Sequence, residues 1–149
     1  MIVIKKISDS EMKVLSTYYE ECKFFKEAIS SSEYIAALDE NTPLGFAEIT
    51  FYEKMLPVIK RMYVNKEERG QGLGDGILRA TLNYVLSNGY SFTVIEGNDN
   101  LSNFYKKEGL LLMKDVKAPK GYQGYFNQYD QNQTFFCNIS SFFIKGCKK

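Results

Sequence analysis

The sequence predicts one mixed α/β (α+β) domain spanning residues 1–149, and three observations predict this fold class. Two runs of β-forming residues, 34–38 and 44–51, flank a short polar turn that contains a proline, which is typical of an antiparallel hairpin. A later strand leads directly into a glycine-rich turn and then a helix. After that helix, short apolar strands alternate with helical segments.

Length and composition restrict the class of protein. A chain of 149 residues is long enough for one core and short for two domains of ordinary size. Hydrophobic residues make up 44% and charged residues 25%, close to the globular average. Because 19 Lys and Arg face 18 Asp and Glu, the net charge of +1 provides no broad basic field, and no nucleic-acid partner is expected.

The N-terminal residues and the apolar runs predict the compartment. Residues 1–6 hold too short an apolar run for a signal peptide, and no run approaches the roughly 20 apolar residues that span a bilayer. We therefore expect a cytoplasmic protein without a membrane partner. The odd number of widely spaced cysteines, Cys22, Cys137 and Cys147, fits free thiols in a reducing compartment.

The sequence contains no histidine, which narrows the chemistry. A histidine-based triad, a histidine metal site and a histidine general base are all excluded. The cysteines show no C-x-x-C spacing, so no metal site is expected.

The N-terminal segment predicts a strand and a helix. Residues 2–7 are read as the first strand, and Ser8 or Asp9 is the expected N-cap of a helix running from about residue 10 toward 26. The aromatic residues within 18–25 fit either core packing or one wall of an acceptor pocket.

The central segment of the chain predicts a strand followed by a glycine-rich turn and a helix. Residues 57–64 are predicted to form a strand. A helix begins at Gly72 or Leu73, because apolar residues then recur at three- and four-residue intervals, and Asn88-Gly89 ends it.

The C-terminal third continues the alternation. Residues 92–95 are expected to form a buried strand, 98–108 a short helix, and 110–113 a strand. Residues 117–133 are too long for a hairpin turn, so they are either a functional loop or a mobile one. Residues 134–144, rich in Phe and Ile, are interpreted as a closing strand.

The glycine-rich turn, residues 69–76, is the main functional signal. Glycine at every second position leaves main-chain N–H groups free to approach an anion, and a helix N-terminus adds its dipole. A nucleoside-triphosphate loop is excluded because Gly74 is followed by Asp75 rather than Lys. A dinucleotide fingerprint is excluded because its final glycine position holds Asp75 or Ile77, depending on the start.

The pattern that remains is Arg-x-x-Gly-x-Gly, formed by Arg69, Gly72 and Gly74. It resembles the acyl-CoA signature of the GNAT superfamily, whose turn binds the coenzyme pyrophosphate. Residues 98–110 are similar to that family's second element, an Asn after a strand followed by a Tyr and Lys before a Gly. The resemblance covers about residues 44–112.

The resemblance implies a GNAT-like fold, with a central mixed, mostly antiparallel sheet of six to seven strands flanked by helices. A splayed strand pair in this fold receives the coenzyme, so acetyl-CoA or coenzyme A is the implied co-substrate. The implied coenzyme-binding residues are Met62, Tyr63 and Val64 on the strand, Arg69, Gly70, Gln71, Gly72, Leu73, Gly74 and Asp75 on the turn, and Asn98, Asn103, Tyr105 and Lys107 beyond it, with Lys106 as an alternative to Lys107.

The resemblance also implies an acetyl-CoA-dependent N-acetyltransferase, in which a primary amine attacks the thioester directly. Tyr105 aligns with the family's general acid, and a main-chain N–H near Met62 would polarise the carbonyl. Many relatives carry a Glu where this chain has Lys60. Glu48 and Glu96 are therefore the candidate bases, and either could instead be a structural carboxylate. Asp75 is expected to point away from a bound phosphate.

The acceptor and two rival functions stay open. Tyr122, Tyr125 and Tyr129 could line a pocket for an apolar or cationic amine, or they could be exposed or pack at a dimer interface. A small-molecule amine, a peptide N-terminus and a protein lysine all stay open as acceptors. One rival is a catalytically silent acyl-CoA-binding module. The other is an interaction domain that forms a homodimer through an apolar edge strand carrying the Phe-rich pairs at 135–136 and 142–143.

Overall fold

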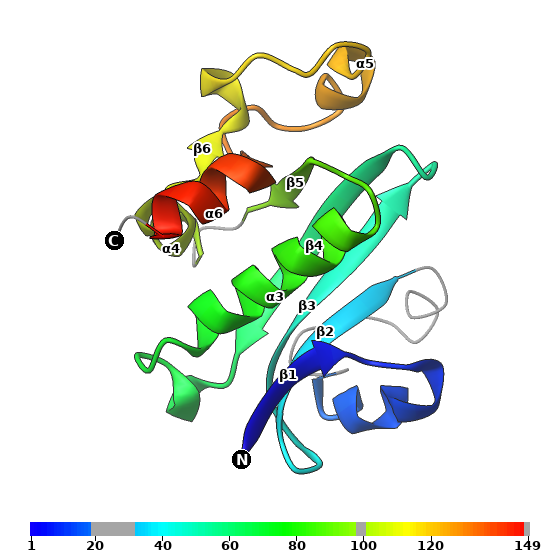
Figure 1. Ribbon diagram of the computed structural model, residues 1–149, viewed down its shortest axis with the longest axis vertical. Helices are drawn as coiled ribbons and strands as arrows, with labels where there is room; N and C mark the ends of the chain where they lie inside the picture. Colours follow the sequence, from blue (N-terminus) through cyan, green and yellow to red (C-terminus); the bar gives the residue numbers. More distant parts are fainter. Residues whose placement is uncertain (19–31, 98–100, 148–149) are drawn as a thin grey trace. The chain divides into compact units, whose positions relative to one another are not determined.

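A computed structural model of the protein describes residues 1–18, 32–97 and 101–147, with side chains up to residue 144 (Figure 1). Within these residues, seven strands form a sheet in the order β1-β2-β3-β4-β5-β7-β6. Four of the described neighbour pairs are antiparallel, and β4 with β5 is parallel. The expectation of a mixed, mostly antiparallel sheet with flanking helices is confirmed.

The chain groups into two compact units. Unit 1 comprises Met1–Thr50 and Met62–Tyr84, and unit 2 comprises Phe51–Arg61 and Val85–Lys149. The boundary crosses β3, β4 and α3, so each of these elements contributes residues to both units.

Unit 1 begins with an antiparallel sheet. Its strands are β1 (Ile2–Lys6), β2 (Glu33–Asp39) and the main part of β3 (Thr42–Tyr52), with Ile4 opposite Ala37 and Ala36 opposite Phe46 (Figure 1). The predicted hairpin is thus confirmed. One face of this sheet packs in a cluster of buried residues: Ile7, Leu15, Tyr18, Tyr34, Ala36, Leu38 and Phe46.

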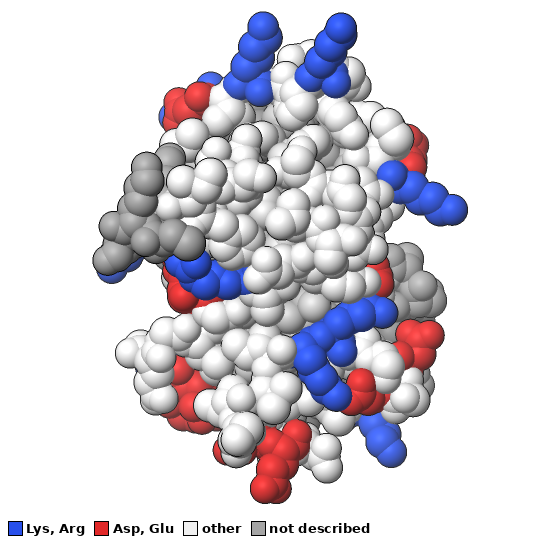
Figure 2. Space-filling model, in the orientation of Figure 1, with Lys and Arg blue, Asp and Glu red and all other residues white. Residues whose placement is uncertain are grey.

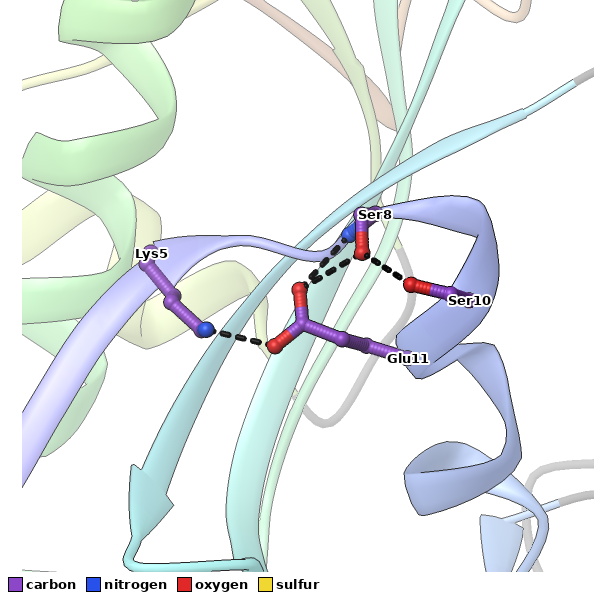
Figure 3. Close-up of polar contacts among 4 residues, drawn as sticks. All are labelled: Lys5, Ser8, Ser10 and Glu11. Carbon is purple, nitrogen blue, oxygen red and sulfur yellow. Dashed lines mark hydrogen bonds and ion pairs between the residues drawn. The ribbon is translucent and has the colours of Figure 1, made fainter.

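The described start of the N-terminal helix is a 3₁₀ helix, η1 (Asp9–Leu15), with Ser8 as its N-cap. Lys5 Nζ donates to Glu11 Oε2 at 2.5 Å, and the Ser8 N–H donates to Glu11 Oε1 at 3.1 Å (Figure 3). The Lys5 hydrogen bond, followed by the Ser8 N–H, lowers the pKa of Glu11 from 4.5 to about 2. Most of the predicted helix at 10–26 lies outside the described residues.

The helix after the glycine turn is α3 (Leu73–Ser87), as the periodicity predicts. Ile77, Leu78 and Leu82 are fully buried on its apolar face. Gly89 follows the helix with a φ of 93°, a conformation that suits glycine and ends the helix.

Unit 2 holds the first part of β4 (Leu56–Val64) and the rest of the sheet. Its other elements are β5 (Phe92–Glu96), α4 (Ser102–Lys107), β6 (Leu111–Leu112), η3 (Met113–Asp115), α5 (Gln123–Phe126), β7 (Thr134–Asn138) and α6 (Ile139–Cys147). The predicted loop at 117–133 therefore contains a short helix, whose Phe126 is buried beside Val58 and Val94.

The predicted strand at 134–144 is wrong beyond Asn138. The Asn138 side-chain oxygen accepts the Ser141 N–H at 3.1 Å, which begins α6. Ile139 and Phe142 are buried at helical spacing, so this apolar run has a period of three to four rather than two.

The predicted apolar edge strand is also wrong. β7 pairs with β5 on one side and with β6 on the other, and it is therefore an interior strand. Phe135 is fully buried and Phe142 is 8% exposed, so both contribute to the core of unit 2. The argument for a dimer through this segment accordingly loses its basis.

No helix in the described part of the chain combines the length and apolarity needed to cross a bilayer. On the face shown in Figure 2, basic and acidic side chains lie interspersed among uncharged ones.

Candidate active site

The end of β4 lies unusually close to β3 at Gly45. A Cβ atom at this position would lie 2.6 Å from the Tyr63 carbonyl oxygen and 3.2 Å from the Val64 Cα. Glycine is therefore required for the main chain of β4 to pass here. The sequence analysis missed this residue, although an isolated glycine within a strand is the signal for such a close approach.

Asn65 fixes the point at which β4 ends. Its N–H donates to the Leu44 carbonyl at 2.9 Å, and its side-chain amide donates to the Pro43 carbonyl at 3.0 Å. Its side-chain oxygen accepts the Tyr18 hydroxyl at 2.7 Å. This residue was also missed, because its partners are distant in the sequence and nothing local marks them.

The glycine turn divides into a left-handed part and a helical part. Gly70 and Gly72 have φ angles of 84° and 82°, which L-residues rarely adopt. The Gly76 N–H bonds to the Gly72 carbonyl at 3.1 Å, so the N–H groups of residues 73–75 belong to the first turn of α3. The turn thus places three main-chain donors at the positive end of a helix dipole.

Arg69 ties the turn back to β4. Its Nε donates to the Val64 carbonyl at 2.8 Å, and its guanidinium carbon lies 5.4 Å from the centre of the Tyr63 ring. This combination of a directional hydrogen bond and ring stacking suits Arg better than Lys. In unit 1, Arg69 therefore positions the turn relative to the residues predicted to bind the coenzyme arm.

Asp75 lies in the first turn of α3, where a carboxylate favours the dipole but would repel a phosphate. Both of its oxygens accept from Arg79 Nε, at 3.0 and 3.1 Å. Since Arg79 lies one turn further along the helix, it partly neutralises the carboxylate and directs it along α3.

Tyr105 is fully buried in unit 2. Its ring centre lies 5.3 Å from that of Phe135. No group in the described ranges is hydrogen-bonded to its hydroxyl. Burial raises the pKa of Tyr105, so the phenol stays protonated throughout the neutral range.

The other predicted residues of the second element lie on or near α4. Asn103, Lys106 and Lys107 are exposed on this helix. Asn98 lies outside the described residues.

The two candidate bases have different environments. Glu48, on β3, is only 2% exposed and accepts the Ser32 hydroxyl at 2.7 Å. Glu96, at the end of β5, has a side chain that is 36% exposed and forms an ion pair with Lys60 at 3.1 Å. Glu96 is thus the carboxylate that a soluble amine can reach more readily.

The predicted acceptor-pocket tyrosines pack against the core of unit 2. Tyr122 donates to the Met55 carbonyl at 3.1 Å, and Tyr125 donates to Glu53 at 3.0 Å. Tyr129 packs against the same cluster and is partly buried. The long segment after η3 is therefore anchored to the β3–β4 hairpin by its aromatic side chains.

A separate pocket of about 340 Å³ lies in unit 1 beside the start of the turn. Tyr18, Pro43 and Asn65 form part of its wall, together with Lys66 and Glu67. None of the predicted coenzyme-binding residues lines this pocket.

Comparison with solved structures places this arrangement in the class of acetyltransferase folds. Tetrahymena GCN5 has a TM-score of 0.72 at 15% identity, covering 92% of this chain and 96% of its own. An acetyltransferase of the GNAT family from Staphylococcus aureus Mu50 has a TM-score of 0.66 at 15% identity, covering 93% and 99%. AtaTR bound with AcCoA has a TM-score of 0.66 at 13% identity, covering 97% and 98%.

The family assignment follows from the sequence itself. The profile of the Acetyltransferase (GNAT) family matches residues 4–110, which include the glycine turn and α4. The chain belongs to this family, and the predicted resemblance is confirmed. No curated protein matches the chain.

Proposed function

We propose that the protein transfers an acetyl group from acetyl-CoA to a primary amine. The observation that carries this proposal is the turn in front of α3, where Gly70 and Gly72 adopt positive φ angles and residues 73–75 offer main-chain donors. Such a turn suits a pyrophosphate. Membership of an acetyltransferase family and the likeness to AtaTR bound with AcCoA support acetyl-CoA as the co-substrate.

In unit 1, the main chain of Met62 and Val64 would bind the pantetheine arm. The Val64 carbonyl already accepts Arg69 Nε, so a ligand there would use its second lone pair or the N–H groups of this strand. The turn residues would then hold the pyrophosphate.

In unit 2, Tyr105 would protonate the departing thiolate. No group in the part of the chain that the structure describes pairs with its hydroxyl, and a buried hydroxyl left unpaired costs about 1–3 kcal/mol, so its retention calls for a functional reason. Because burial raises its pKa, Tyr105 stays protonated at neutral pH, so it carries the proton that this role needs and cannot serve as the base.

Glu96 would take the proton from the attacking amine. Its side chain is partly exposed, whereas Glu48 is buried and bonded to Ser32. A neutral amine is needed for attack on the thioester carbonyl, and a carboxylate beside the arriving ammonium provides the acceptor for its proton.

The test is calorimetric titration with acetyl-CoA and with CoA, followed by thiol-release assays over a panel of primary amines. Gly72→Glu should abolish binding, because it strains the turn and adds a negative charge where the phosphate would lie. Gly124→Glu is the matched control, since Gly124 lies outside the turn and has no atom within 4 Å of its Cβ position.

Binding of acetyl-CoA with thiol release supports the proposed transferase. Binding without thiol release across the panel would favour the catalytically silent module. No binding by the folded parent protein would refute both.

A further inference from the structure

Lys60 and Glu96 meet where the parallel pairing of β4 and β5 ends. The register pairs Val58 with Val94 and Ile59 with Ile95. Because side chains alternate along a strand, Lys60 and Glu96 project from the same face as the two valines. Their ion pair, at 3.1 Å, therefore follows the buried Val58–Val94 pair along the two strands, at the point where the strands reach solvent.

The Val58–Val94 pair belongs to the core of unit 2, which the segment after η3 covers. Val58 and Val94 are buried in this cluster, and Tyr129 packs against it. Glu96 therefore combines a negative charge with an apolar strand pair directly before it, and these two features together favour an alkylammonium ion.

The Lys60 side chain is itself an alkylammonium ion bound to this carboxylate. Both partners are partly exposed, at 43% for Lys60 and 36% for Glu96, so solvent weakens the pair and exchange is easy. The pair shows which chemistry the position accepts: a terminal ammonium on an unbranched chain of four carbons.

We propose that Glu96 binds the ammonium group of the acceptor in the place that Lys60 occupies in the free protein. The acceptor is then an unbranched primary alkylamine, such as a lysine side chain or a free aliphatic amine. This inference rests on the proposed function. Lys60 is a specificity-determining residue, because it competes with the acceptor for the same carboxylate.

The proton balance is simple. The acceptor ammonium transfers one proton to Glu96, and the resulting amine attacks the thioester carbonyl. The carbon–sulfur bond breaks as the carbon–nitrogen bond forms, and the thiolate takes a proton from Tyr105. The proton lost from the amide nitrogen restores the Tyr105 phenol, and Glu96 releases its proton to solvent, so one proton is released per turnover.

The test compares two acceptor probes of equal formula and charge, n-butylamine and tert-butylamine. Lys60→Met should lower the KM for n-butylamine by about two- to five-fold, in line with loss of a competing surface ion pair. Turnover number should change little, and Lys60→Arg should restore the parent KM. Lys120→Met, the same change of charge at an exposed site of unit 2, should leave the KM unchanged.

A direct binding readout uses carbon-13 labelled glutamate. The side-chain carboxyl signal of Glu96, assigned with Glu96→Gln, should shift with n-butylamine at lower concentration in Lys60→Met than in the parent, and respond weakly to tert-butylamine. Glu96→Gln should raise the KM for n-butylamine by about ten-fold or more, while acetyl-CoA binding and the unfolding temperature stay at parent values.

The outcomes separate the two proposals. Failure of acetyl-CoA to bind refutes the proposed function. If acetyl-CoA binds, the inference alone is wrong when Lys60→Met leaves the KM and the carboxyl titration unchanged. It is also wrong when n-butylamine neither shifts the Glu96 signal nor is acetylated.

Discussion

Gly45→Ala should displace the end of β4 and weaken both coenzyme binding and the fold. The new Cβ would lie 2.6 Å from the Tyr63 carbonyl oxygen, and an ordinary contact begins at 3.4 Å, so the strand must move by about 0.8 Å. The Ile77 Cδ1 atom, at 3.0 Å, can rotate away, but the carbonyl cannot. Strain of this kind costs about 1–3 kcal/mol.

The expected effects can be scaled from this displacement. A loss of about 2 kcal/mol in a domain of this size lowers the unfolding temperature by roughly 4–8 °C. Misplacement by about 1 Å can reduce activity by about a hundred-fold. Met62 and Val64 flank the displaced carbonyl, so the strand residues expected to bind the coenzyme move with it. We therefore expect the Kd for acetyl-CoA to rise at least about ten-fold, which is less than the hundred-fold effect on activity.

Thermal unfolding and calorimetric titration with acetyl-CoA measure these two effects. Gly124→Ala is the control, since nothing lies within 4 Å of its Cβ position. The double variant Gly45→Ala/Ile77→Val should remain defective, because only the side-chain contact is relieved. A Gly45→Ala protein that unfolds and binds like the parent would refute the close approach of the two strands.

Three further predictions concern single side chains. Tyr105→Phe should lower turnover with acetyl-CoA affinity unchanged, and it should raise the unfolding temperature because it removes a buried hydroxyl that is unpaired among the described residues; an unaltered rate would remove the phenol from the mechanism. Arg69→Lys should raise the Kd for acetyl-CoA several-fold without unfolding, because Lys cannot combine the bond to Val64 with stacking on Tyr63; unchanged affinity would contradict that role. Glu11 has a lowered pKa in the folded state, so its contribution to stability is present above pH 4.5 and is lost as the pH falls toward 2. Parent and Glu11→Gln should therefore differ in unfolding temperature near pH 6 and converge near pH 2, and a constant difference would contradict the pairing with Lys5.

Much of the fold could be predicted because its signals are local. The helix α3 follows from apolar spacing and a terminal glycine, and the β2–β3 hairpin follows from β-formers around a polar turn. The C-terminal segment failed because short apolar runs do not distinguish a strand from a helix. Asn138, a good N-cap, was the local signal that marked the change.

The candidate site could be predicted from the sequence only where consecutive residues form it. The turn from Arg69 to Asp75 is contiguous, so its pattern can be read directly. Gly45 acquires its role from a carbonyl on the next strand, and the Lys60–Glu96 pair depends on the parallel register of β4 and β5. Such contacts between strands are a property of the folded sheet, and no local spacing encodes them.

The left-handed glycines of the turn have a consequence for substitution. Nothing lies within 4 Å of the Cβ positions of Gly70 and Gly72, so a side chain has room at either place. For folding of the turn, the φ angles of 84° and 82° disfavour any L-residue whatever its size, whereas the size of a side chain would matter only against a bound phosphate. Tolerance should therefore follow backbone preference: asparagine, which enters the left-handed region more readily, should be accepted ahead of the smaller alanine.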